Sequence, residues 1–125
     1  MLENRFLVWQ KEGTLRFLDQ TKLPREECWI TTRDWEEVAD AIRLLKIRGA
    51  PIIGIAAAYA LCLAARSILR PGASPVRVVR ELQKVHEALL ATRPTAVNLA
   101  WALSRMQSVW GGEWVRKPAD RGWGG

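Results

Sequence analysis

The sequence is poor in residues that bind metals or react as nucleophiles. Its 125 residues include two cysteines and one histidine. Cys28, Cys62 and His86 do not fall at the spacings typical of a metal site. We therefore expect two reduced, partly buried thiols, and neither a metal nor a cofactor. His86 is expected to be a half-exposed helix residue and not a catalytic group.

Long hydrophobic runs and an N-terminal targeting segment are also lacking. No charged start is followed by an apolar run, so the sequence predicts no signal peptide. The most apolar stretch, Pro51 to Ala65, is rich in alanine. We expect it to be too short and too weakly hydrophobic to cross a membrane. It should instead form a buried core helix of a cytoplasmic protein.

Acidic residues are outnumbered by basic ones. The 19 Lys and Arg residues against 13 Asp and Glu residues give a net charge of +6. A basic balance favours an anionic partner. The basic residues are scattered and are not interleaved with aromatic ones. This distribution favours solvated surface and a few anion ligands over a nucleic-acid-binding patch.

The remaining pattern predicts an α+β fold with a single core. Residues 5–9, 14–18 and 27–31 are short apolar runs that favour strands. The turn at Gly13 favours a hairpin between the first two, with the third strand completing a small antiparallel sheet.

About four helices are expected after the strands. Thr32 or Asp34 can cap the first helix, and with Asp34 as the cap Glu37 would complete a capping box. Pro51 and Ser74-Pro75 are well placed to begin the next two helices. The four helices are expected over residues 34–47, 51–69, 75–90 and 94–107.

The end of the sequence differs in character. We divide the chain into an N-terminal domain over residues 1–108, with a sheet over 1–32 and helices over 33–108, and a segment over 109–125. That last segment is rich in Trp and Gly and has no helical or strand periodicity. Two interpretations remain open, a disordered natural tail and a product of a frameshift.

One turn between two expected helices could bind an anion. The segment Arg48 to Gly54, which we call the anion cradle, places an arginine and a glycine before a helix N-terminus. The first turn of a helix offers unpaired N–H groups and a partial positive charge, and it binds phosphate readily. Gly49 allows close backbone approach, and Ala50 keeps the next side chain small. The alternative is an ordinary turn with an exposed arginine.

A second arginine, Arg93, occupies a similar position in the sequence. Arg93 precedes Pro94, as Arg48 precedes Pro51, and each proline is expected to begin a helix. Arg93 could therefore converge on the cradle from the side, where its guanidinium would bind phosphate bidentately.

These motifs resemble the methylthioribose-1-phosphate isomerases. The likeness rests on Ile47 to Ala60 (IRGAPIIGIAAAYA), Arg93 to Leu99 (RPTAVNL), Leu18 to Pro24 (LDQTKLP) and Val38 to Ile42 (VADAI). The same superfamily holds the initiation factor 2B regulatory subunits. The resemblance implies an aldose-to-ketose isomerisation in methionine salvage, with Arg48, Gly49, Ala50 and Arg93 contacting a sugar phosphate.

The resemblance also implies what this sequence does not contain. The catalytic cysteine and aspartate of that family belong to a Rossmann-like C-terminal domain whose motifs are absent here, so we expect the chain alone to be inactive. Alternatives are a non-catalytic initiation factor 2B-like assembly module and a remnant without function. Association into a homodimer through the surface that would meet the missing domain is a further expectation.

Overall fold

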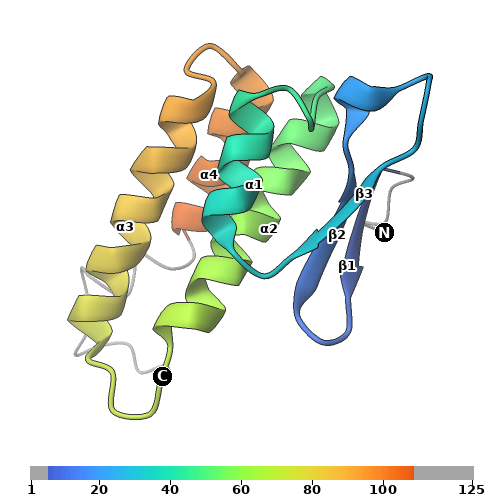
Figure 1. Ribbon diagram of the computed structural model, residues 1–125. Helices are drawn as coiled ribbons and strands as arrows, with labels where there is room; N and C mark the ends of the chain where they lie inside the picture. The colour runs from blue at the N-terminus through green and yellow to red at the C-terminus, as the bar shows by residue number, and fades with distance from the viewer. Residues whose placement is uncertain (1–5, 109–125) are drawn as a thin grey trace.

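The computed structural model describes residues 6–108 and has two layers, a three-stranded sheet and four helices (Figure 1). The elements in chain order are β1 (Leu7–Gln10), β2 (Thr14–Leu18), the 3-10 turn η1 (Gln20–Lys22), β3 (Trp29–Thr32), α1 (Trp35–Arg43), α2 (Ala50–Ile68), α3 (Pro75–Thr92) and α4 (Val97–Gln107). The predicted α+β layout is confirmed. The segment 109–125, for which we predicted an irregular tail, lies outside the described residues.

The sheet is an antiparallel meander in the order β1-β2-β3. Leu7 pairs with Phe17, and Phe17 pairs with Ile30. These apolar side chains share one face because directly paired residues point to the same side of a sheet. Gly13, with a φ of 83°, closes the predicted hairpin, and its N–H donates to the Gln10 carbonyl at 2.9 Å.

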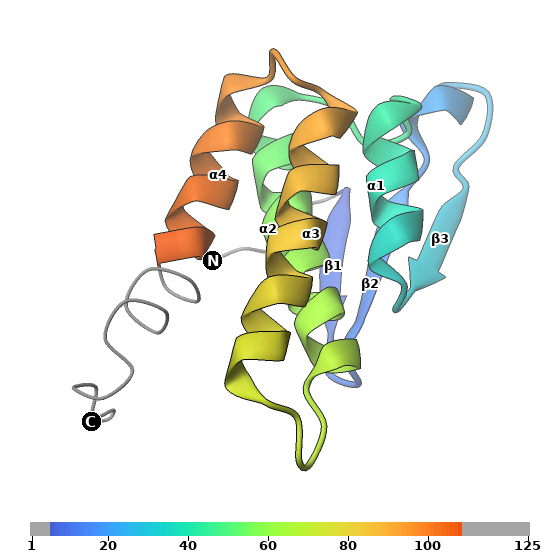
Figure 2. The same cartoon turned by 90° about the vertical axis from the view of Figure 1, so that its left-hand side faces the viewer.

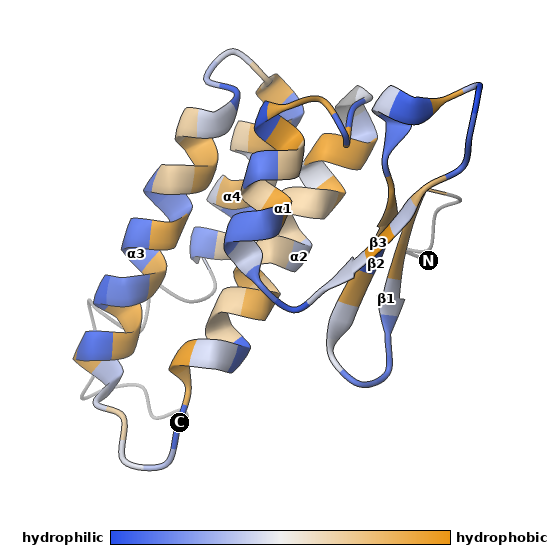
Figure 3. Ribbon diagram, in the orientation of Figure 1, coloured by the Kyte–Doolittle hydropathy of each residue, from blue (hydrophilic) through white to orange (hydrophobic). Residues whose placement is uncertain are grey.

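The central element is α2, which packs against α1, α3, α4 and β1 (Figure 2). Its fully buried alanines are small enough to let these neighbours approach closely: Ala56, Ala57, Ala60 and Ala64. Trp9 of β1 stacks on Tyr59 with ring centroids 5.1 Å apart. Figure 3 shows the apolar character of α2 beside the polar outer turns of α1 and α3.

The length of α2 corrects one expectation. The helical window Pro51–Ile68 is long and apolar enough to cross a membrane by length and composition alone. The predicted stretch, Pro51 to Ala65, ends before Ile68, so the expectation that it is too short to cross a membrane is wrong for the helix as a whole. Of this window, 44% is buried inside the structure. The elements α1, α3, α4 and β1 all pack against α2, as is typical of a core helix.

The end of α1 also differs from the prediction, because it comes one turn before Ile47. Leu45 adopts a φ of 66° and donates its N–H to the Ile42 carbonyl at 3.2 Å. Lys46 donates to the Ala41 carbonyl at 2.9 Å. These two bonds form a Schellman motif, in which a left-handed residue ends the helix. Leucine rarely occupies that position, so the sequence pattern did not indicate it.

Two side-chain expectations are wrong. The Asp34 carboxylate caps α1 by accepting from the Glu36 N–H at 2.9 Å, and not from Glu37 as a capping box requires. The Asp34 N–H donates to Thr32 Oγ1 at 3.0 Å instead. His86 is 6% exposed on α3 and is therefore a buried residue.

Candidate functional site

The helices of the bundle alternate in direction, so two helix N-termini lie at each end (Figures 1 and 2). At one end, Asp34 caps α1, and Ser74 caps α3 by accepting from the Arg77 N–H at 3.2 Å. At the other end, the N-caps of α2 and α4 are Gly49 and Ala96, and neither makes a side-chain capping bond. That second end therefore concentrates N–H donors and positive partial charge.

The two uncapped N-termini lie close together. A Cβ atom added at Gly54, in the second turn of α2, would lie 2.9 Å from the Asn98 carbonyl oxygen in the first turn of α4. The helices thus pack almost backbone against backbone at this end. A ligand placed over one N-terminus is also near the other.

The anion cradle forms the start of α2. Gly49 has a φ of 104°, a conformation that favours glycine because it has no Cβ. Ala50 is the first helical residue, and Pro51 follows without an N–H. The Ile53 N–H donates to the Gly49 carbonyl at 2.9 Å, so the N–H groups of Gly49 and Ile52, which precede it, have no acceptor within the helix.

Arg93 corrects part of the predicted echo. It is the half-buried C-cap of α3, and its carbonyl accepts from the Ala96 N–H at 2.9 Å. This turn delays α4 to Val97, so the expectation that Pro94 begins a helix is wrong. The loop that joins α3 to α4 and contains Arg93 lies at the same end of the bundle as the start of α2 (Figure 2). The ligand role of Arg93, like that of Arg48, Gly49 and Ala50, stays a prediction.

The turn η1 lies at the same end of the molecule (Figure 1). Asp19 is 3% exposed, and its carboxylate accepts from the Thr21 N–H at 3.0 Å and from the Thr21 hydroxyl at 2.6 Å. Burial raises the pKa of Asp19, but these bonds together with Lys46 and Lys22 lower it overall. A charged Asp19 therefore holds the turn in shape.

Gln20, delivered by this turn, contacts the cradle directly. Its backbone N–H donates to the Lys46 carbonyl at 2.9 Å. Its side-chain Nε2 donates to the Arg48 carbonyl at 3.2 Å, and Arg48 Nη2 donates back to the Gln20 carbonyl at 3.4 Å. Gln20 is not among the site residues predicted from the sequence, although Gln20 belongs to Leu18 to Pro24, one of the motifs that carry the family resemblance.

The other side chains that could bind a metal or react chemically lie outside the cradle. Within residues 6–108, no group of three or more His, Cys, Asp or Glu side chains could hold a metal ion. Cys28 and Cys62 are free and half-buried, as expected, and burial raises the pKa of the Cys62 thiol. Burial lowers the pKa of His86, against a smaller opposing effect of Glu87.

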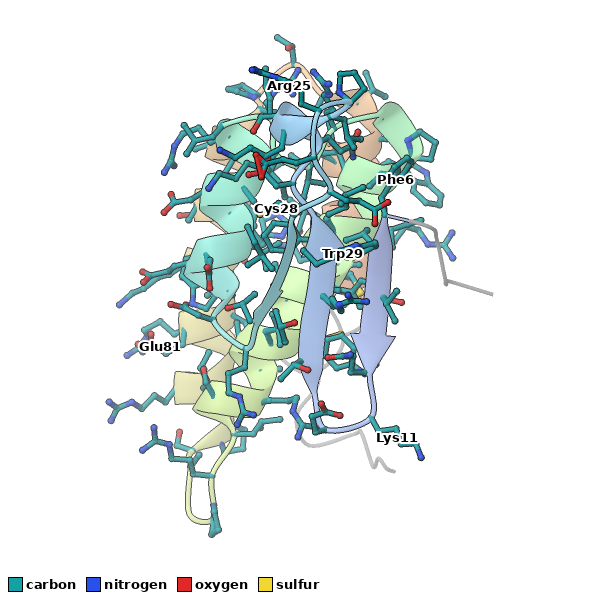
Figure 4. The ribbon with its side chains drawn as sticks, turned by 45° about the vertical axis from the view of Figure 1, so that its right-hand side comes forward. Phe6, Lys11, Arg25, Cys28, Trp29 and Glu81 are labelled. Atoms are coloured by element: carbon teal, nitrogen blue, oxygen red, sulfur yellow. The ribbon has the colours of Figure 1, made fainter. Side chains whose placement is uncertain are left out.

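Cationic side chains gather near the turn η1 and the start of α2. Arg25 projects from this end of the molecule (Figure 4), and Lys22 follows Asp19 and Gln20 in η1. Trp29 lies on the open face of the sheet, where the Arg16 guanidinium stacks 4.3 Å from its ring centroid. Arg16 thus packs on an aromatic ring, whereas Arg48 at the cradle is exposed.

The fold is an α+β domain in which two helix N-termini without side-chain caps lie at the end of the bundle that carries the cradle. The sequence profile of the Initiation factor 2 subunit family matches residues 46–117, and the chain belongs to this family. Among curated relatives, methylthioribose-1-phosphate isomerase of Syntrophotalea carbinolica is 48% identical over 98 residues, which cover 78% of this chain and 28% of the relative. The enzyme of the same name from Alkalilimnicola ehrlichii is 48% identical over 107 residues, 84% of this chain and 30% of the relative.

Solved structures give the same family. The crystal structure of 5-methylthioribose 1-phosphate isomerase from Pyrococcus horikoshii OT3 matches with a TM-score of 0.77 and 34% identity, over 86% of this chain and 29% of that chain. That of translation initiation factor eIF-2B subunit delta from A. fulgidus matches with a TM-score of 0.72 and 42% identity, over 82% and 29%. The chain thus spans less than a third of the length of these relatives.

Proposed function

We propose that this chain is the N-terminal part of a methylthioribose-1-phosphate isomerase, and that it holds the phosphate and sugar of the substrate. The observation that carries the proposal is the pair of uncapped helix N-termini, α2 and α4, at one end of the bundle. The other two helices have side-chain caps. Arg48 and Arg93 add guanidinium groups that suit a phosphate. The relatives named after this substrate support the choice of ligand.

The proposed role is binding without turnover. Moving a proton between neighbouring carbons requires a positioned acid and base. Asp19, the buried carboxylate at this end, is occupied by Thr21 and held ionised. The cradle itself supplies one cationic side chain, that of Arg48, and N–H donors. We therefore expect saturable binding of 5-methylthioribose 1-phosphate by the 125-residue chain, and no formation of the ketose product.

Calorimetric titration of 5-methylthioribose 1-phosphate tests this role. Arg48→Ala should weaken binding roughly tenfold or more, because a hydrogen bond to a charged group contributes about 1.5–3 kcal/mol. Arg80→Ala is the matched control, since Arg80 is an exposed arginine on α3. Absence of saturable binding, or equal affinity of the Arg48→Ala variant and the wild type, contradicts the proposal.

A second candidate function is a non-catalytic assembly module. The similarity to the eIF-2B delta subunit favours it, and so do the exposed Val97 and Trp101 on α4, 77% and 63% exposed. Sedimentation of the purified chain separates the two candidates. Self-association that Trp101→Ser abolishes, without binding of the sugar phosphate, supports the assembly module.

A further inference from the structure

The contact between Gln20 and Arg48 joins segments far apart in the sequence. The Gln20 side chain is 8% exposed and donates to the Arg48 carbonyl at 3.2 Å. The Gln20 backbone is tied to the same loop through the Lys46 carbonyl at 2.9 Å. Asp19 fixes the turn from the other side, because its N–H donates to the Cys28 carbonyl at 2.8 Å.

Holding the Arg48 carbonyl also holds the next amide. The peptide group between Arg48 and Gly49 is planar, so the direction of the Arg48 C=O sets the direction of the Gly49 N–H. Gly49 is the N-cap of α2 and has the φ of 104° that glycine permits. Glycine loses more conformational entropy than other residues when its backbone is fixed. A hydrogen bond from outside the turn is therefore needed more here than at another residue type.

The Arg48 side chain is restrained from the same residue. Arg48 Nη2 donates to the Gln20 carbonyl at 3.4 Å. The guanidinium therefore has one N–H group engaged and keeps others for a ligand, since arginine carries five N–H donors. A pre-oriented guanidinium loses less conformational entropy when it binds a phosphate.

We propose that Gln20 is a positioning residue for the anion cradle, which it orients through the Arg48 carbonyl and the Gly49 turn. This inference rests on the proposed function, since it assigns to Gln20 the alignment of the site that binds the sugar phosphate. Gln20 itself needs no contact with the ligand.

The variant Gln20→Met tests this role, because it keeps the length of the side chain and removes the amide donor. Methionine fills a similar volume, and water can hydrogen-bond the carbonyl of the exposed Arg48 in place of the amide, so the melting temperature should change little. Affinity for 5-methylthioribose 1-phosphate should nevertheless fall about fivefold, the effect of one neutral hydrogen bond. The split between stability and affinity distinguishes positioning from a general structural role.

Gln83→Met is the matched control. Gln83 is half-buried, and its side chain accepts from Gln107 Nε2 at 2.8 Å and donates to Glu87 at 3.0 Å. The Gln83→Met variant thus loses side-chain hydrogen bonds on α3, outside the cradle. We expect this variant to bind the sugar phosphate as the wild type does. Equal losses of affinity in Gln20→Met and Gln83→Met, or wild-type affinity in Gln20→Met, overturn the inference.

Amide hydrogen exchange at Ile53 separates this inference from the proposed function. Ile53 makes the first hydrogen bond of α2, to the Gly49 carbonyl at 2.9 Å. Faster exchange at Ile53 in Gln20→Met than in the wild type supports positioning even if the wild type binds no sugar phosphate. In that case only the proposed function fails. Unchanged exchange at Ile53 refutes positioning even if the wild type binds.

Discussion

Gly54 and Asn98 bring the start of α2 against the start of α4, with 2.9 Å between the Asn98 carbonyl oxygen and the position that a Cβ of residue 54 would take. The next nearest atoms are the Asn98 carbonyl carbon at 3.4 Å and the Ala102 Cβ at 3.6 Å. This close approach requires glycine, because real Cβ atoms essentially never lie under 3.0 Å from a backbone atom.

Gly54→Ala should destabilise the domain by about 1–3 kcal/mol, the usual cost of overpacking. Helix propensity alone predicts the opposite, a gain of about 1 kcal/mol. The sign of the change therefore decides between backbone contact and propensity. Chemical denaturation followed by circular dichroism measures it, and a more stable variant would show that α2 and α4 do not touch here.

At position 45, glycine should give a more stable protein than alanine. The φ of 66° that Leu45 adopts costs a residue with a Cβ about 1–2 kcal/mol, and glycine avoids that cost. Leu45→Gly and Leu45→Ala lose the same half-exposed leucine, so their difference isolates the backbone. We expect Leu45→Gly to be more stable than Leu45→Ala by about 1 kcal/mol in urea denaturation. Equal stability would mean that α1 does not end in a Schellman motif.

Asp19 should make stability depend on pH in the acidic range. Its pKa is lower in the folded chain than the ordinary value of 3.8, so the unfolded chain binds the proton first as pH falls. The contribution of Asp19 is fully present above pH 3.8 and is lost as pH falls through the folded pKa. The stability advantage of the wild type over Asp19→Asn should shrink in that window. A constant difference between pH 6 and the acid limit would argue against an ionised, hydrogen-bonded Asp19.

His86 should make the stability of the domain depend on pH in a higher range than Asp19 does. Burial holds the pKa of His86 below 6.5 in the folded chain, so the unfolded chain protonates first as pH falls below that value. The free energy of unfolding should therefore decrease as pH falls from about 6.5 through the folded pKa. His86→Leu should flatten this slope in denaturation curves measured between pH 7 and pH 5. The same slope in both proteins would mean that His86 is accessible to protons in the native state.

Much of the fold followed from the sequence because its determinants are local. Gly13 with the flanking apolar runs predicted the hairpin, and Ser74-Pro75 predicted the start of α3. The alanine-rich stretch after Pro51 predicted the core helix. In each case, a residue's own backbone preference or a regular apolar spacing was sufficient.

The sequence alone also determined the cradle itself, since Arg48, Gly49 and the start of a helix are neighbours in the chain. Only the tertiary structure decided what lies around it. The hydrogen bonds between Gln20 and Arg48 join residues 28 positions apart in the sequence. The approach of Asn98 to Gly54 depends on how α4 packs. The early end of α1 depends on a leucine forced into a glycine-like conformation, with the next but one residue, Ile47, buried in the core. Local propensity fixes elements, but contacts between distant segments, and the strain that packing can impose, depend on the whole core.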